Sequence, residues 1–283
     1  MISPKLGPCQ VVQIHGKSEK NLNGSKCIGV FKNQDMNFLL DMITKNNLQH
    51  VVQENNLDIQ SELNSSALMI NHCDSFMKFP VSSVLDPENA GMKNENKYVK
   101  WQRSFDNSSQ KIEIIDSFLV EAKKVVLQDS LIQSLRIVVD EFFTNAVYNA
   151  PLASPSTEIS PQPRKENVVQ MSKGNLGRMV MGYDQNKMVI GCEDSYGSLN
   201  LSDLMIRIKN CYDLGLDKVI NFDSQGGAGI GTFMVIDICT SFYAAVNPGK
   251  KTWVLAAVPY TLSGKKRQEI GKNIHLVNCK VGD

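Results

Sequence analysis

Residues 140–150 have the sequence DEFFTNAVYNA, which places Glu141, Asn145 and Asn149 at intervals of four. Residues four apart on an α-helix lie nearly one above the other, so these polar side chains are expected to follow one ridge. The apolar residues of 130–149 form a stripe on the opposite side, which is typical of a helix packed on a sheet. An amide oxygen suits Mg²⁺, and a carboxylate one turn away can accept a proton. The same ridge also fits an ordinary solvated helix face.

An acidic residue ends the next informative stretch, 188–199, with the sequence MVIGCEDSYGSL. Its apolar start predicts a buried strand, and Asp194 stands where that strand ends. A carboxylate at such a position can accept a hydrogen bond from an exocyclic amine, which distinguishes adenine from other bases. Asp followed by Gly is also ordinary turn chemistry, so both interpretations stay open.

A glycine cluster opens a predicted helix at 225–235, with the sequence QGGAGIGTFMV. Glycine lets the backbone approach a phosphate, and the free N–H groups at a helix start attract anions. No Lys-Ser/Thr pair follows the glycines and no strand precedes them, which argues against a P-loop and a Rossmann motif. A flexible glycine turn is the alternative.

In this order, the three motifs resemble the nucleotide-binding domain of the GHKL superfamily, which includes gyrase and the histidine kinases. The similarity covers about residues 98–258, and residues 140–150 resemble most closely the E-x-x-T-N-A-x-x-H motif of anti-sigma-factor serine kinases. The resemblance implies that ATP and Mg²⁺ are the cofactors, with Glu141 as catalytic base and Asn145 as metal ligand. It implies the following cofactor-binding residues: Asp194 on adenine, Gly227, Gly229 and Gly231 in the phosphate loop, and Asn149, Tyr196 and Gly197.

Two motifs depart from the family pattern. The family has D-x-G-x-G where this chain has DSYGS, so Tyr196 and Ser198 replace both glycines. A tyrosine there could stack on the base or fill its pocket. Asn149 stands in place of the histidine that ends the family's first motif. The sequence therefore supports nucleotide binding more firmly on the phosphate side than on the adenine side.

The resemblance implies an α/β sandwich of the GHKL (Bergerat) type with a mixed sheet. Helices at 111–126, 130–149 and 232–239 would pack on one face, and residues 217–225 would form a short lid. Three parts are expected along the chain: a small N-terminal α/β segment (1–95) of unknown role, a regulatory one included, an ATP-binding domain (96–260) and a basic extension (261–283). The polar stretch 86–96 favours a linker at the first boundary.

The composition argues against nucleic acid and membranes as partners and indicates the cellular compartment. The chain has 283 residues, and its 30 basic and 29 acidic side chains give a net charge of +1, which argues against direct nucleic-acid binding. No stretch is long and apolar enough for a membrane span, and the amino terminus lacks a signal-peptide pattern. Seven scattered cysteines without a C-x-x-C pair indicate thiols in a reducing compartment. A cytoplasmic protein is expected.

The resemblance implies a regulator that binds Mg-ATP and phosphorylates a Ser or Thr of a protein partner, or sequesters that partner, and the composition indicates that it is cytoplasmic. The resemblance implies an anti-sigma antagonist or a sigma-like regulator as the partner. The alternative is a non-catalytic interaction module of the same fold that has lost ATP turnover or ATP binding. A gyrase-type ATPase has less support because no transducer domain is evident. A sensor histidine kinase is not favoured, because His72, the one plausible phosphoacceptor among the four histidines, is not on a long amphipathic helix and no membrane span is expected. Whether the chain forms a homodimer stays open.

Overall fold

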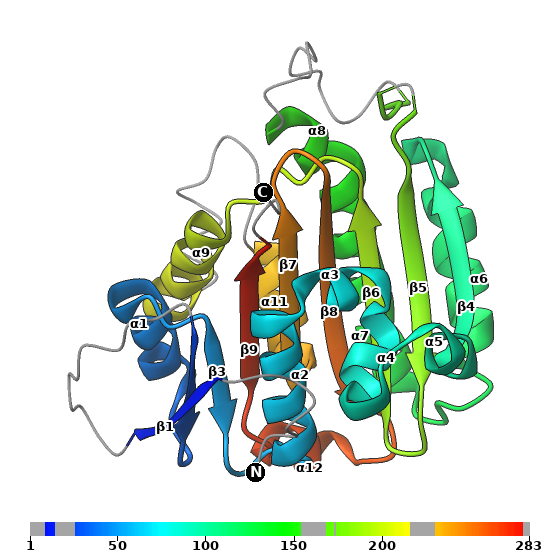
Figure 1. Ribbon diagram of the computed structural model, residues 1–283. Helices are drawn as coiled ribbons and strands as arrows, with labels where there is room; N and C mark the ends of the chain where they lie inside the picture. The colour runs from blue at the N-terminus through cyan, green and yellow to red at the C-terminus, as the bar shows by residue number, and fades with distance from the viewer. Residues whose placement is uncertain (1–8, 15–25, 154–167, 173, 216–229, 280–283) are drawn as a thin grey trace.

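A computed structural model describes residues 9–14, 26–153, 168–172, 174–215 and 230–279 of the chain. In this part of the chain, a nine-stranded sheet forms a central layer with helices on both of its faces (Figure 1). The predicted α/β class with a mixed sheet is therefore confirmed.

The sheet is mixed, and its strand order is β1-β2-β3-β9-β7-β8-β6-β5-β4. The pairs β1–β2, β2–β3 and β7–β9 are parallel and the other five are antiparallel. The strands are β1 (Gln10–Ile14), β2 (Cys27–Phe31), β3 (His50–Gln53), β4 (Val99–Phe105), β5 (Gly177–Tyr183), β6 (Lys187–Asp194), β7 (Ser241–Asn247), β8 (Lys251–Pro259) and β9 (Asn273–Asn278).

Helices cover both faces of this sheet. The helices predicted at 111–126, 130–149 and 232–239 share one face, as expected, and helices of residues 59–98 cover the other. The first face carries α1 (Met36–Asn46), α6 (Lys111–Ala122), α7 (Asp129–Thr144), α9 (Leu201–Leu214) and α11 (Ile230–Ile238). The second face carries α2 (Ile59–Asn71), α3 (Cys73–Lys78), α4 (Pro80–Leu85) and α5 (Met92–Tyr98). No helix in the described residues has both the length and the apolar character that crossing a bilayer requires.

Side chains on β7 show why both faces need cover. Phe242, Ala244 and Val246 point into the core under the first set of helices. Tyr243 and Ala245 point into the core under the second set. A strand that is buried on both faces has a nearly continuous apolar run, as residues 242–246 do.

The second layer of helices was not predicted, because the sequence of α2 contains several polar residues that are buried. Glu62, Asn64, Ser65 and Ser66 are all buried on this helix. The carboxylate of Glu62 accepts hydrogen bonds from Tyr243 (2.7 Å) and Ser241 (2.9 Å) of β7. Buried polar side chains of this kind need partners, and here the partners lie far along the chain.

The predicted boundary near residue 95 does not interrupt the sheet. The strands β1, β2 and β3 come from the N-terminal segment, and β3 pairs with β9 through His50 and His275. The stretch 86–96, predicted as a linker, forms the 3-10 helix η3 (Pro87–Asn89) and most of α5. Its polar composition reflects partial exposure on the outer face of the helical layer.

The C-terminal residues are not the solvated extension that the sequence suggested. They form α12 (Gly264–Glu269) and then β9, which lies between β3 and β7 in the sheet. His275 of β9 is fully buried, and its ring nitrogens lie 3.0 Å from Glu62 Oε2 and 2.9 Å from Ser66 Oγ. The basic cluster at 265–267 lies on the short α12, and the next strand completes the core.

Two of the seven cysteines correct the expectation that all are thiols. Cys73 at the start of α3 and Cys279 directly after β9 form a disulfide across 206 residues of sequence. Spacing along the chain gave no sign of the pair, because only the position of β9 brings the two residues together.

Candidate functional site

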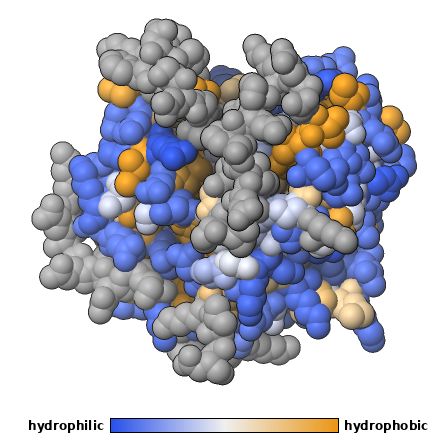
Figure 2. All heavy atoms as spheres, turned by 90° about the horizontal axis from the view of Figure 1, so that it is seen from above, coloured by the Kyte–Doolittle hydropathy of each residue, from blue (hydrophilic) through white to orange (hydrophobic). Residues whose placement is uncertain are grey.

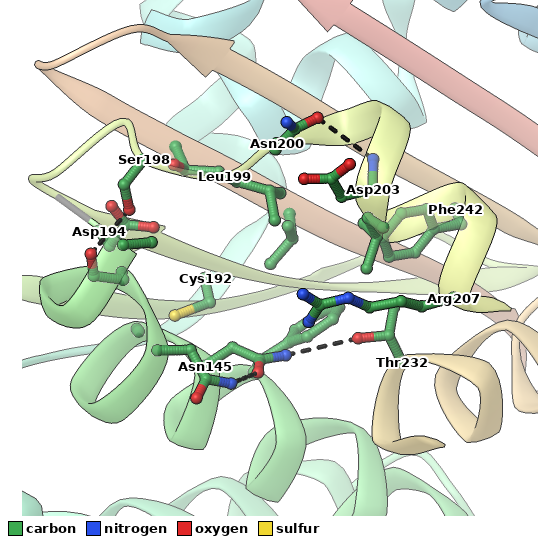
Figure 3. A pocket seen from close by; sticks show the side chains of 18 residues that line it. Asn145, Cys192, Asp194, Ser198, Leu199, Asn200, Asp203, Arg207, Thr232 and Phe242 are labelled. Atoms are coloured by element: carbon green, nitrogen blue, oxygen red, sulfur yellow. Dashed lines mark hydrogen bonds between the residues drawn. The ribbon is translucent and has the colours of Figure 1, made fainter. Parts of the chain in front are cut away.

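A cavity of about 230 Å³ lies between η5 and α9 on the first helical face, next to β6 and β8 (Figure 3). Its apolar wall includes Phe142, Leu199, Phe242 and Val254. The described surface at the end of the molecule where β6 ends is largely hydrophilic (Figure 2). The polar side chains that line the cavity are Asn145, Asn149, Asp194, Ser198, Asn200, Asp203, Arg207, Thr232 and Thr252.

A π-helical turn shapes one wall of this cavity. The helix predicted at 130–149 is α7 followed by the π-helix η5 (Asn145–Asn149) and the short α8 (Ala150–Ala153). The backbone N–H of Ala150 bonds to the carbonyl of Asn145, five residues earlier. In an α-helix, a residue four positions later lies slightly further round the helix axis. The wider π-turn reduces this offset, so both Asn145 and Asn149 stay on the cavity side. Such single π-turns occur frequently at functional sites.

The predicted polar ridge forms one continuous hydrogen-bond chain. Asn145 Nδ2 donates to Glu141 Oε1 (2.8 Å), and Asn149 Nδ2 donates to Asn145 Oδ1 (2.5 Å). Thr232 Oγ1 of α11 donates to the same Glu141 oxygen (3.1 Å). Glu141 itself does not line the cavity, but the two side chains that hold it do.

The environment of Glu141 raises the pKa of its carboxyl group. Burial is the main cause, since the charged form loses solvation, and the hydrogen bonds from Asn145 and Thr232 oppose it. A carboxylate with a raised pKa, held in place by two side chains, is suited to accept a proton from a nearby hydroxyl.

Close approach explains the glycine at the start of α11. A Cβ atom at Gly231 would overlap with the carboxylate of Glu141. Gly231 therefore lets α11 pack against α7 and places Thr232 beside Glu141. The other predicted phosphate-loop residues, Gly227 and Gly229, and the predicted lid 217–225 lie outside the described residues.

Asp194 occupies the end of β6, as the sequence predicted, and is only 8% exposed. Its Oδ1 accepts hydrogen bonds from the backbone N–H groups of Tyr196 (2.9 Å) and Gly197 (3.2 Å). Thr252 faces it across the β6–β8 pair. Burial raises the pKa of Asp194, although the two backbone groups and the Thr252 hydroxyl act in the opposite direction. A buried carboxyl group in a cavity whose pKa is raised by burial is a candidate for a functional site.

Tyr196 and Gly197, both predicted to bind the cofactor, do not line the cavity. The ring of Tyr196 is buried in the core, and its hydroxyl accepts a hydrogen bond from the backbone N–H of Ser172 (3.0 Å). Gly197 has φ +59° and lies against the β7–β8 hairpin. Tyr196 therefore neither stacks in the cavity nor fills it, and Ser198 is the residue of this turn that reaches the lining.

Sequence reasoning missed the residues that α9 contributes. Asn200 begins this helix by accepting hydrogen bonds from the backbone N–H groups of Ser202 (3.0 Å) and Asp203 (3.2 Å). Asp203 and Arg207 follow at helical spacing and line the cavity with it. The face of α9 that meets the cavity depends on how this helix packs against its neighbours. No sequence signal specified it.

A metal ion at this site would have few acidic ligands. The described residues contain no group of three or more His, Cys, Asp or Glu side chains arranged to hold a metal. The amide oxygen of Asn145 has one lone pair left beyond its bond to Asn149, which fits a hard cation carried mainly by ligand phosphates.

Comparisons with protein-family models, curated proteins and solved structures give no match for this chain.

Proposed function

We propose that the chain binds ATP together with Mg²⁺ in this cavity, as a cytoplasmic regulator that resembles anti-sigma-factor serine kinases. It would phosphorylate or sequester a protein partner, such as an anti-sigma antagonist or a sigma-like regulator. The supporting observation is the meeting of three motifs that are far apart in the sequence. Asn145 and Asp194 line one cavity, and Glu141 and Gly231 are in contact directly behind Asn145.

Each residue has a distinct part in this proposal. Asp194 accepts a hydrogen bond from the exocyclic amine of adenine, and the apolar wall holds the base. Asn145 holds Mg²⁺, which neutralises phosphate charge when bound. Glu141 accepts the proton of the attacking Ser or Thr hydroxyl, whose oxygen bonds to the γ-phosphorus as ADP leaves, and Asn145 and Thr232 fix the orientation of Glu141.

Calorimetry on the full chain tests the binding step. We expect ATP to bind with micromolar affinity in the presence of Mg²⁺ and more weakly with a chelator. A nucleotide present at 100 times its dissociation constant should stabilise the fold by about 2.7 kcal/mol. The absence of both a heat of binding and a shift of the thermal midpoint would contradict the proposal.

Changing Glu141 to Gln tests the chemical step. The amide keeps the size of the side chain and its bonds to Asn145 and Thr232, but it cannot accept a proton. We expect phosphoryl transfer or hydrolysis of labelled ATP to fall by at least about 100-fold, the usual contribution of a general base, with ATP affinity nearly unchanged. Asp140→Asn is the matched control, since Asp140 is an adjacent, more exposed carboxylate paired with Lys111 (2.9 Å). Turnover at the wild-type rate in Glu141→Gln would remove this residue from the mechanism.

One observation favours the alternative of an interaction module without ATP turnover. Glu141, Asn145, Asn149 and Thr232 are already connected to one another by hydrogen bonds. Such a network is stable without a ligand. Capture of a partner with equal yield in the presence and absence of ATP, by a chain that gives no heat with ATP, would support this alternative.

A further inference from the structure

The polar ridge and Asp194 leave the one basic residue of the described cavity lining without a role. Arg207 of α9 lines the cavity on the side opposite η5, and its guanidinium group points inward (Figure 3). It is the only Lys or Arg side chain in the lining formed by the described residues. It makes no ion pair or hydrogen bond with any of them.

The other charges of α9 show that a pair was available to Arg207. Asp203 lies four residues earlier, which is the favourable order for a helical ion pair, yet the two side chains do not pair. Lys209 on the same helix pairs with Asp213 (2.7 Å) and with Asp41 of α1 (3.0 Å). Arg207 is therefore directed into the cavity although a partner stands one turn away.

The remaining charged groups at the cavity are acidic. Asp194 and Asp203 line it, and Glu141 lies directly behind Asn145. A polyanionic ligand would therefore meet unfavourable charge unless cations offset it. A guanidinium group binds two oxygens of one phosphate in a fixed geometry, which a metal held through a single amide oxygen does not provide.

We propose that Arg207 is the phosphate-recognition residue of the site, and that it makes the cavity select nucleoside triphosphates over nucleosides. This inference rests on the proposed nucleotide binding. The guanidinium group would contact the phosphates from α9, across the cavity from Asn145.

Calorimetry with Mg-ATP and with adenosine on three variants tests this role. Arg207→Ala should weaken ATP binding by about 10- to 100-fold, the range for a charge-assisted hydrogen bond, and change adenosine binding less than about twofold. Arg207→Lys should recover part of the ATP affinity, because an ammonium group keeps the charge without the two-point contact. Arg136→Ala, which removes an exposed charge from α7, should match the wild type for both ligands.

The outcomes separate this inference from the proposed function. Wild-type protein that binds neither ATP nor adenosine would overturn both. Wild-type protein that binds ATP, with Arg207→Ala unchanged, would overturn the role of Arg207 alone. An equal loss for ATP and adenosine would also overturn it, since Arg207 would then act on the shape of the cavity. Arg207 is exposed, so thermal unfolding of the variants should match the wild type.

Discussion

The Asp194→Asn variant should bind ATP about 100-fold more weakly than the wild type, which corresponds to about 2.7 kcal/mol. Asparagine keeps one oxygen, which can still accept hydrogen bonds from the backbone of Tyr196 and Gly197. The other atom changes from an acceptor to an NH₂ donor. This NH₂ group would face the exocyclic amine of adenine. Two hydrogen-bond donors would then lie against each other in a buried position, and neither would have an acceptor.

The pH dependence of ATP affinity should point to the same residue. Burial raises the pKa of Asp194, so its carboxylate becomes protonated at a higher pH than an ordinary aspartate. Only the ionised form accepts the hydrogen bond with full strength. ATP affinity in the wild type should therefore decline as the pH falls toward this raised pKa, and Asp194→Asn should lack that decline.

The matched control for this prediction is Asp203→Asn. Asp203 lines the same cavity but is exposed on α9, and its side chain is not part of the turn after β6. Calorimetry should show nearly normal ATP affinity for this variant. If Asp194→Asn and Asp203→Asn lose ATP affinity equally, the loss would follow from the change in net charge of the cavity. Asp194 would then not be the residue that recognises the base.

The Gly197→Ala variant should lose about 3 kcal/mol of unfolding free energy. Gly197 has φ +59°, a conformation that alanine adopts only with strain. A Cβ atom there would also overlap with the carbonyl oxygen of Asn247 and lie 2.7 Å from the backbone nitrogen of Lys250. Both contacts are with backbone of the β7–β8 hairpin, which cannot move aside as a flexible side chain does.

Gly249→Ala separates the two causes. Gly249 lies in the same hairpin turn with φ +70°, but nothing lies within 4 Å of an added Cβ atom. Its variant should lose only the part that comes from backbone strain, about 1 kcal/mol. Urea denaturation of both proteins gives the comparison. Equal losses would show that the close approach to the hairpin contributes nothing.

Local patterns in the sequence predicted most elements of residues 98–258. The apolar start of 188–199 predicted the buried strand that is β6, and the helix predicted at 111–126 is α6, with its C-terminus placed four residues too late. Asp194 at the end of a strand and Gly231 at the start of a helix were placed in the same way. Such features are encoded by neighbouring residues, so they can be recognised without knowledge of the rest of the fold.

Only the tertiary structure decided which elements meet. The insertion of β9 into the sheet, the second helical layer, the Cys73–Cys279 pair and the inward direction of Arg207 all depend on contacts between distant segments. Glu62 and His275 illustrate the physical reason, because each has a polar side chain that is typical of a surface. Their burial is favourable because they bond to each other across 213 residues of sequence and to polar groups of β7 and α2. Local periodicity records which side of an element is buried, whereas the partner that makes burial of a polar group favourable is set by the fold as a whole.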